Sequence, residues 1–471
     1  MSTDLWKWSA TDLARAIRGR DISAREATQS ALERVQAINP KVNAIVDLMA
    51  EEALAAADKA DAAPRRGEPL APLHGVPVTL KINIDVAGRP TTNGVVAFKD
   101  RVAREDSPVV TNLRRAGAIF IGRTNVPAFS TRYFTDCELH GRTLNPWDAD
   151  RTPGGSSGGA AACVATGMGA IANGNDRAGS VRHPAYCCGV FGLRPTLGRV
   201  PTFESTSPDE IAIATQLAHV QGVLARNVDD LRLGFAATMA GDARDPWWVP
   251  VPLRKETPAP GRIALTMQKA EPAVQNALRQ AAKWLQEAGY AVEEAEPPRL
   301  EEAGRLFFTL VVSEGLASKE DKAGTSRAIE AYGDEPSKRA RRSMIAWAKP
   351  LDYEGYVNAW ARRVAILRQW MLFFERYQAL LLPVSRVRPF PIDEDQRGDT
   401  AMAALLESNV PLLAASTLGL PGLAAPATLA DGVPVGVQLI GPRYGEEVLL
   451  AAGAAIGARQ QVMTGPIDPR R

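Results

Sequence analysis

Residues 76–84 (VPVTLKINI) alternate between apolar and polar side chains over nine positions. A period of two predicts a β-strand, with Val78, Leu80 and Ile82 on one face and Lys81 on the other. Because a strand with an apolar face has to be covered by other elements, the patterns that flank it decide the fold class.

Helical and strand patterns alternate along the rest of the chain. Two capping-box patterns, Ser9-x-x-Asp12 and Ser23-x-x-Glu26, open predicted helices near the N-terminus. The later predicted elements are a helix and then a buried strand in 108–122, a helix in 159–166, a β-α-β unit in 263–292 and mainly helix in 300–378. This alternation predicts an α/β fold.

The composition argues against several functional classes. The chain of 471 residues carries 55 Lys+Arg and 53 Asp+Glu, so its net charge of +2 favours no nucleic-acid partner. We expect no membrane segment, because no apolar run reaches the ~18 residues that a span needs and no signal peptide is recognisable. The cysteines form no C-x-x-C pair, which predicts reduced, buried thiols and a cytoplasmic protein; they are Cys137, Cys163, Cys187 and Cys188.

A glycine-serine loop, residues 153–159 (PGGSSGG), runs into the alanine-rich helix predicted at 159–166. Its glycines allow a close backbone approach to a ligand, and the helix N-terminus presents free N–H groups. The loop lacks the Lys and Ser/Thr of a phosphate-binding loop, which argues against a nucleotide. It matches G-x-S-x-G at Ser156 and Ser157, but no strand precedes it, so an α/β-hydrolase-type esterase is only an alternative.

A second serine, Ser180, lies in a glycine-preceded turn. A predicted helix and a short strand separate it from Ser156, so the chain can return and bring the two loops together. The backbone N–H groups of Arg177, Ala178, Gly179 and Ser180 could then bind a developing oxyanion, as acyl transfer requires.

A serine nucleophile also needs a base. His183 and His219 follow the two serines, but neither has an obvious acidic partner in the sequence. Lys81 is either an edge-strand residue with its amine in water or a buried residue. Burial that lowers its pKa from ~10.4 to ~7.5 costs about 4 kcal/mol, and the neutral amine could then accept a proton.

In order and spacing, these motifs resemble the amidase signature family. They are LHGVPVTLK (73–81), GRTN (122–125), NPWD (145–148), GGSSGG (154–159), DRAGSVR (176–182), GLRPT (192–196), GLP (419–421) and DGVPVGVQLIG (431–441). The resemblance implies one large core, a mixed central β-sheet surrounded by helices, in place of the two to four domains that length alone allows. Within a single domain, residues 1–471, we expect N-terminal helices in 1–66, the catalytic core in 67–240, a variable substrate-pocket section in 241–410 and C-terminal strands with a helix in 411–471.

The resemblance also implies an amide hydrolase that works through an acyl-enzyme. Ser180 would be the nucleophile, Ser156 would bridge after a cis Gly155–Ser156 peptide, and Lys81 would be the base. The four N–H groups named above would form the oxyanion hole, and Ser157, Asp176 and Arg182 would support the site. No metal and no cofactor are implied.

Four positions depart from the family pattern, namely Ile82, Ala128 and the pair Arg177-Ala178, which replaces Ile-Gly. Arg177 either faces the pocket and biases substrate choice or points to solvent. His140 and His183 are expected to be packing or hydrogen-bonding groups.

The substrate is less constrained than the chemistry. An amide, an anilide or a carbamate (urethane) fits, with ester cleavage as a side activity. The alternatives are the glutaminase-type subunit of a tRNA-dependent amidotransferase and a non-catalytic scaffold, which the intact Lys81 and serines argue against. Two copies of the chain could associate as a homodimer.

Candidates for an apolar pocket wall are Trp247, Trp248, Phe307, Phe308, Trp347 and Trp360. The charged run 338–342 (KRARR) is expected on a solvated helix face.

Overall fold

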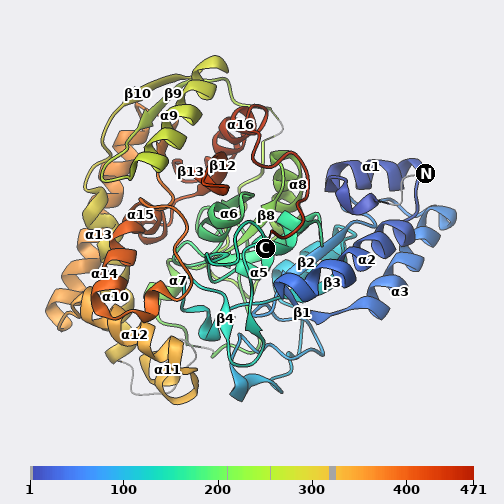
Figure 1. The fold of residues 1–471 in the computed structure, drawn as a ribbon, viewed down its shortest axis with the longest axis horizontal. Helices are drawn as coiled ribbons and strands as arrows, with labels where there is room; N and C mark the ends of the chain where they lie inside the picture. Colours follow the sequence, from blue (N-terminus) through green and yellow to red (C-terminus); the bar gives the residue numbers. More distant parts are fainter. Residues whose placement is uncertain (1–3, 209, 255, 318–324, 471) are drawn as a thin grey trace.

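The computed structural model describes residues 4–208, 210–254, 256–317 and 325–470. Their strands, in chain order, are β1 (Ile45–Leu48), β2 (Pro77–Lys81), β3 (Ile119–Thr124), β4 (Asp136–Cys137), β5 (Gly141–Arg142), β6 (Ile171–Asp176), β7 (Phe191–Arg194), β8 (Val220–Ala225), β9 (Arg262–Leu265), β10 (Ala291–Glu294), β11 (Ala379–Leu382), β12 (Gly422–Ala430) and β13 (Val433–Ile440). All but β4 and β5 belong to one central sheet (Figure 1).

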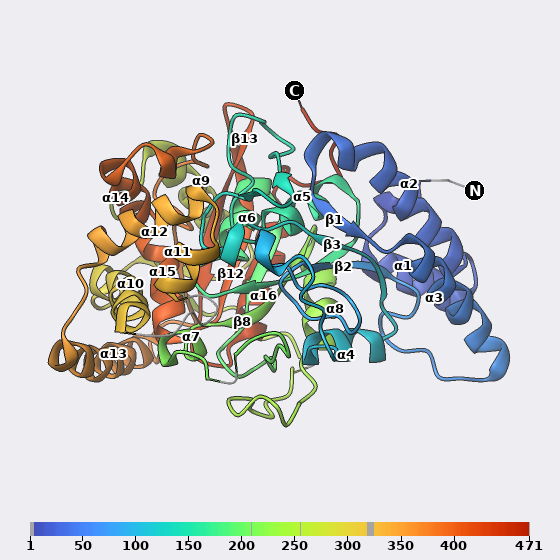
Figure 2. The same cartoon turned by 90° about the horizontal axis from the view of Figure 1, so that it is seen from below.

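Helices cover this sheet and extend beyond its two ends. They are α1 (Ala10–Gly19), α2 (Ala24–Val42), α3 (Ala50–Ala62), α4 (Pro108–Arg115), α5 (Gly158–Thr166), α6 (Arg182–Cys188), α7 (Ile213–Gln216), α8 (Val228–Thr238), α9 (Pro272–Glu287), α10 (Leu300–Ala317), α11 (Ser326–Tyr332), α12 (Glu335–Ala348), α13 (Tyr353–Phe374), α14 (Asp399–Ser408), α15 (Val410–Leu418) and α16 (Glu446–Gly457). Short 3-10 helices lie at Leu5–Lys7, Ala63–Arg66, Val96–Phe98, Ala128–Ser130 and Glu394–Gln396. Both views place α1 to α3 at one end of the molecule and α10 to α14 at the other (Figures 1 and 2).

The central sheet is mixed, as expected. Its strand order is β1-β3-β2-β6-β8-β7-β12-β13-β11-β9-β10. The neighbours β3, β2 and β6 run parallel, as do β11, β9 and β10, and the remaining neighbours are antiparallel. The section 241–410 supplies β9, β10 and β11, so it continues the sheet instead of forming a separate one.

Local sequence signals explain why several elements begin and end where they do. Ser9 caps α1 by accepting from the backbone N–H of Asp12, and Ser23 with Glu26 forms a complete capping box on α2. Strand β2 ends at Lys81, earlier than the predicted 76–84, because the chain turns there and the N–H of Ile84 donates to the carbonyl of Lys81.

Strand β2 is an interior strand of the sheet. It lies between β3 and β6, and every one of its residues is buried, so Lys81 is not an edge residue. Parallel neighbours end at the same edge of a sheet, so the carboxyl ends of β2 and β6 meet there. Lys81 and Asp176, the last residues of these strands, are thereby brought to one edge.

All four cysteines are free and buried, which confirms the predicted thiols. Among the described residues, none of the helices by itself combines the length and the hydropathy of a membrane span. The successive helices α14 and α15 meet the length and composition criteria only as a pair, which is bent by 64°.

Candidate active site

Lys81 and Ser156 are joined by a hydrogen bond. The Nζ atom of Lys81 donates to the Oγ of Ser156 at 2.7 Å and to the Oδ1 of Asn175 at 2.7 Å. The peptide bond between Gly155 and Ser156 is cis, as the resemblance predicts. Only glycine fits at position 155, because a Cβ there would lie 2.3 Å from the carbonyl oxygen of Arg132.

The surroundings of Lys81 favour its neutral amine. The side chain is fully buried, and burial holds the pKa of Lys81 well below its ordinary value, although Asp176 acts in the opposite direction. The acceptor at Asn175 is a carboxamide oxygen and carries no charge. A neutral lysine can accept a proton from Ser156, which makes this pair a candidate for general-base chemistry.

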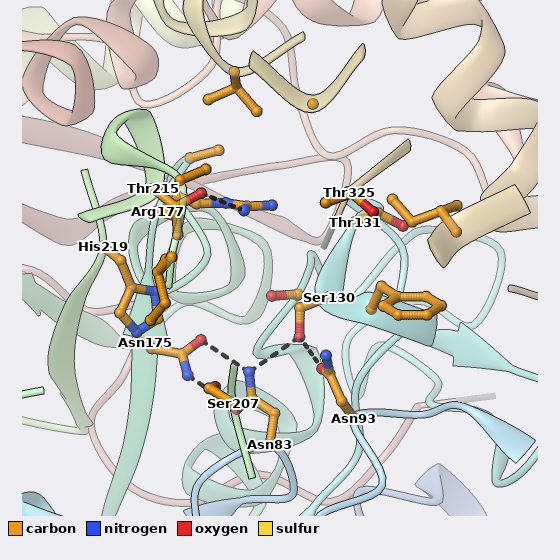
Figure 3. A pocket seen from close by; sticks show the side chains of 18 of the residues that line it. Asn83, Asn93, Ser130, Thr131, Asn175, Arg177, Ser207, Thr215, His219 and Thr325 are labelled. Carbon is orange, nitrogen blue, oxygen red and sulfur yellow. Dashed lines mark hydrogen bonds between the residues drawn. The ribbon is translucent and has the colours of Figure 1, made fainter. Parts of the chain in front are cut away.

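Asn175 is a site residue that the sequence analysis missed. Its Nδ2 donates to the Oδ1 of Asn83 at 2.9 Å (Figure 3), and its own Oδ1 accepts from the Nζ of Lys81 at 2.7 Å. The available signal was a run of polar residues, Asn173 to Asp176, at the end of a buried strand.

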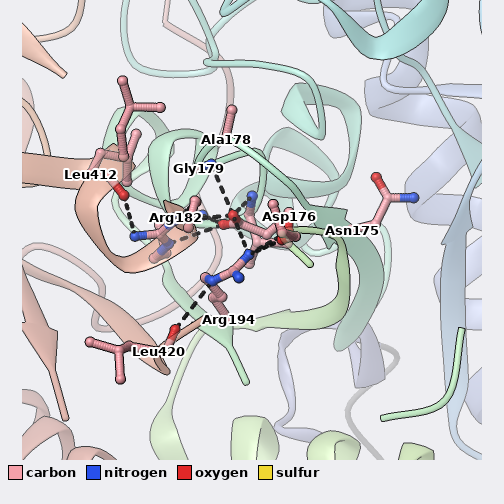
Figure 4. Close-up of polar contacts among 12 residues, drawn as sticks. Asn175, Asp176, Ala178, Gly179, Arg182, Arg194, Leu412 and Leu420 are labelled. Atoms are coloured by element: carbon pink, nitrogen blue, oxygen red, sulfur yellow. Dashed lines mark hydrogen bonds and ion pairs between the residues drawn. The ribbon is translucent and has the colours of Figure 1, made fainter. Parts of the chain in front are cut away.

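Asp176 organises the turn that carries Ser180. Its carboxylate accepts from the backbone N–H groups of Gly179 at 2.8 Å and Val181 at 3.2 Å, and it pairs with the guanidinium groups of Arg182 and Arg194 (Figure 4). Burial alone would raise the pKa of Asp176, but the two arginines outweigh it and hold this pKa well below the usual range. The ionised carboxylate of Asp176 therefore holds the turn in place.

The N–H groups of this turn are not all free. The N–H of Gly179 is committed to Asp176, whereas those of Arg177, Ala178 and Ser180 donate to no acceptor among the described residues. Gly179 adopts φ +96°, and a Cβ there would lie 2.2 Å from Leu412 Cδ2, so the turn requires glycine at this position.

Ser157 links the loops of the two serines. Its backbone N–H donates to the carbonyl of Ser180 at 3.2 Å, and its Oγ lies 3.5 Å from the carbonyl oxygen of Asn175. Ser156 and Ser180 consequently line the same cavity, whose volume is about 670 Å³. This size is in the usual range for a small-molecule site.

Aromatic and apolar side chains form much of the cavity wall. The contributors include Phe98, Phe129, Phe307, Phe308 and Met344. Of the candidates from the sequence, Phe307 and Phe308 line the cavity, but the four tryptophans do not. Trp247 is 41% exposed, and Trp347 donates to Glu407.

Four arginines also line the cavity, namely Arg101, Arg132, Arg177 and Arg341. Arg177 faces it and donates to the Oγ1 of Thr215 at 3.3 Å, which decides between the two orientations considered above (Figure 3). Arg341 belongs to the charged run 338–342 and is only 6% exposed. The expectation of a solvated face was wrong at this residue, because α12 packs on α10 and buries Arg341 with Ala340 and Met344.

The histidines near the site are neutral packing groups. Burial lowers the pKa of His183 to about 3, and its ring stacks on Phe390. Burial and nearby cations lower the pKa of His219, a cavity residue, to about 3. His140 lies 3.1 Å from the Oγ1 of Thr92. Among the described residues, no cluster of three or more His, Cys, Asp and Glu could hold a metal ion.

A family model described as Amidase matches residues 26–450. The chain belongs to the amidase family. This amidase is 44% identical over 469 residues to an indoleacetamide hydrolase of Bradyrhizobium diazoefficiens, an alignment that covers 98% of this chain and 88% of that relative. It is 32% identical over 478 residues to a glutamyl-tRNA(Gln) amidotransferase subunit of Moorella thermoacetica, with 96% of each chain covered.

The fold agrees with this assignment. A bacterial aryl acylamidase of the amidase signature family matches the structure with a TM-score of 0.82 at 26% identity, over 98% of this chain and 97% of that chain. The amidase is thus a hydrolase of amide carbon–nitrogen bonds on the fold that the motifs predicted.

Proposed function

We propose that this amidase cleaves an amide with an aryl or other bulky apolar part, using Ser180 as nucleophile, Ser156 as proton relay and Lys81 as base. The observation that supports these roles most strongly is the 2.7 Å hydrogen bond from the buried amine of Lys81 to Ser156, beside a cavity that Ser180 also lines. A hydroxyl is a weak nucleophile unless a base removes its proton, and the neutral amine of Lys81 supplies that base.

In the acylation step the Oγ of Ser180 bonds to the amide carbonyl carbon. Its proton passes to Ser156, and the proton of Ser156 passes to Lys81. The carbonyl oxygen becomes an oxyanion that the free N–H groups of Arg177, Ala178 and Ser180 bind. When the carbon–nitrogen bond breaks, Ser156 donates its proton to the leaving nitrogen and takes one back from Lys81, and the amine departs.

In the deacylation step a water molecule attacks the ester carbonyl of the acylated Ser180. The pair of Lys81 and Ser156 takes the proton from the water and returns a proton to the Oγ of Ser180 as the ester bond breaks. The products are a carboxylic acid and an amine, and the enzyme returns to its starting state.

The substrate class follows from the cavity wall and the relatives. The aromatic side chains Phe98, Phe129, Phe307 and Phe308 offer apolar surface to a ring. The 44% identical relative is an indoleacetamide hydrolase, whose name denotes an arylacetamide substrate. Arylacetamides and anilides are therefore the substrates we propose first, and the reduced thiols favour a cytoplasmic enzyme.

The test is a substrate panel on wild type and Ser180→Ala. It contains an arylacetamide, an anilide, a carbamate, an ester and glutamine. We expect turnover of the arylacetamide or anilide and its loss in Ser180→Ala, whereas Ser385→Ala, a buried serine elsewhere, keeps it. Full turnover in Ser180→Ala would refute the nucleophile, and turnover confined to glutamine would favour the amidotransferase alternative.

A further inference from the structure

Three of the four arginines that line the substrate cavity form no ion pair with a described carboxylate. Arg101 is only half-buried, donates to the carbonyl of Thr206 and lies over the ring of Phe98. The other two are Arg177 and Arg341. Arg177 lies in the turn before Ser180, and Arg341 lies on α12. Arg341 is 6% exposed, and among the described residues its guanidinium donates only to the Oγ of Ser326, at 2.8 and 3.1 Å. The side chain of Arg177 donates to the hydroxyl of Thr215 and to no other described residue. Within the described residues, neither arginine forms an ion pair.

Most other buried arginines of this protein pair with a carboxylate, whereas Arg226 and Arg363 donate to backbone carbonyls. Arg132 pairs with Asp395 at 2.7 Å, Arg182 with Asp176 at 3.0 Å, and Arg199 with Glu446 at 2.7 Å. A buried charge without a counter-charge is costly, so a fold keeps one only where something else compensates for it. A hydroxyl group satisfies a donor but does not neutralise a charge.

Glu204 and Glu314, which also line the cavity, form no ion pair with these arginines. Glu314 accepts from the backbone N–H groups of Ile213 and Ala214 and from the hydroxyl of Tyr356. Glu204 accepts from the N–H of Asp85 at 2.6 Å, and burial, with the charge of Asp85, raises its pKa well above the ordinary value.

The two guanidinium groups also affect each other. Burial, with the charge of Arg177 adding to it, lowers the pKa of Arg341 to about 10. Arg341 therefore stays charged at neutral pH, and this end of the cavity carries a double positive charge that faces an apolar wall containing Phe307, Phe308 and Met344.

We propose that the natural substrate is an amide that carries a carboxylate, and that Arg177 and Arg341 together bind this group. This inference rests on the proposed amide hydrolysis and adds the substrate's charge to it. The planar fork of a guanidinium matches the two oxygens of a carboxylate, and the hydrogen bonds between them are strong because both groups are charged. The apolar part of the same substrate would lie on the phenylalanines.

The experiment compares matched amides with and without a carboxylate. Phenylacetamide bearing a 4-carboxyl group is compared with its 4-acetyl counterpart, and phenylacetanilide bearing a 4-carboxyl group on the aniline is compared with unsubstituted phenylacetanilide. We expect kcat/KM to favour at least one carboxylated amide by tenfold or more. The favoured member tells whether the acyl or the amine part carries the charge.

Substitutions then show which residues cause the preference for a carboxylated amide. We expect Arg341→Met to reduce the ratio of carboxylated to neutral kcat/KM by about 10-fold to 100-fold, the usual range for a hydrogen-bonded charged group, and Arg177→Met to act in the same direction. Arg341→Lys should restore part of the ratio. Arg339→Met is the matched control, because it removes the same charge from the exposed side of α12.

Binding provides a readout that does not depend on turnover. In a Ser180→Ala background, calorimetry should show that the carboxylated amide binds more tightly than its neutral partner, and that Arg341→Met removes this difference. If wild type hydrolyses neutral amides through Ser180 but neither turnover nor binding favours a carboxylate, the inference is wrong and the proposed function stands. If Ser180→Ala retains turnover but Arg341→Met still removes the carboxylate preference, the nucleophile is wrong and the anion site stands.

Discussion

The carboxamides of Asn83 and Asn175 pair with each other, and this pairing directs the Oδ1 of Asn175 at the amine of Lys81, 2.7 Å away. Lys81 is thus held by an uncharged acceptor on one side and by the hydroxyl of Ser156 on the other. A carboxylate at position 175 would stabilise an ammonium ion instead. The neutral amide therefore favours a lysine that is free to accept a proton.

Asn175→Asp tests this relationship. An opposite charge in contact raises the pKa of Lys81, by about 1 to 3 units for such pairs. The acid limb of the rate against pH should shift upward by at least about one unit, and activity at neutral pH should fall. Asn93→Asp, which adds the same charge at another position of the cavity wall, should leave the limb in place. An unshifted limb in Asn175→Asp would contradict the role of Asn175.

Lys81→Met tests the base. Removal of a positioned general base lowers the rate by about 10²-fold to 10⁴-fold. We expect a loss of this size in kcat for an amide substrate, together with loss of the acid limb, while circular dichroism shows an intact fold. A wild-type pH profile in Lys81→Met would remove this residue from the mechanism.

The same variant should change how stability depends on pH. Because the pKa of Lys81 is well below 10.5 in the folded protein, the unfolded chain binds one more proton between the lowered value and 10.5. The free energy of unfolding of wild type should therefore rise with pH through this window, relative to Lys81→Met. Urea unfolding of both proteins between pH 7 and pH 10 measures the difference. A constant difference across this range would mean that Lys81 is charged in the folded state.

Asp176→Asn tests the anchor of the Ser180 turn. The substitution leaves the buried Arg182 and Arg194 without their anion, and breaking a buried pair typically costs about 3 to 5 kcal/mol. Denaturant unfolding should show a loss of this order. Asp393→Asn is a control, because Asp393 is 40% exposed and shares its arginines with other carboxylates, so its loss should stay below about 1 kcal/mol. Equal losses in the two variants would contradict a special role for Asp176.

His219→Asn tests whether a histidine contributes to the pH profile. With a pKa of about 3, His219 is neutral over the whole working range, so the variant should keep the acid limb of wild type. Loss of that limb in His219→Asn, with Lys81 intact, would identify the histidine as the titrating group.

Local patterns predicted much of the fold. Strand β2, helix α5 and the β9-α9-β10 unit depend on side-chain periodicity and on glycine stops, which act over a few residues. The alternation in 76–84 could not show that Lys81 is buried, because that depends on β3 and β6 lying on either side of β2. Helix α3 was missed, since its alternating alanines and charges form no clear apolar face.

The candidate site could be predicted only in part, because several of its contacts join residues that are far apart in the chain. The motifs pointed to Lys81, Ser156 and Ser180, but the contact between Asn83 and Asn175 joins residues 92 positions apart. The burial of Arg341 depends on α10 packing against α12, and the sequence of α12 alone shows only a charged helix. Long-range packing thus decides which polar residues near the motifs belong to the site.

The central claim is that Ser180 becomes acylated during turnover. Acid quenching during hydrolysis of a reactive anilide or ester, followed by peptide mass spectrometry, measures this directly. The mechanism predicts that the acyl mass appears on the peptide containing Ser180, and that it is absent in Ser180→Ala. An acyl group on Ser156 or on any other residue, or turnover by Ser180→Ala at the wild-type rate, would contradict it.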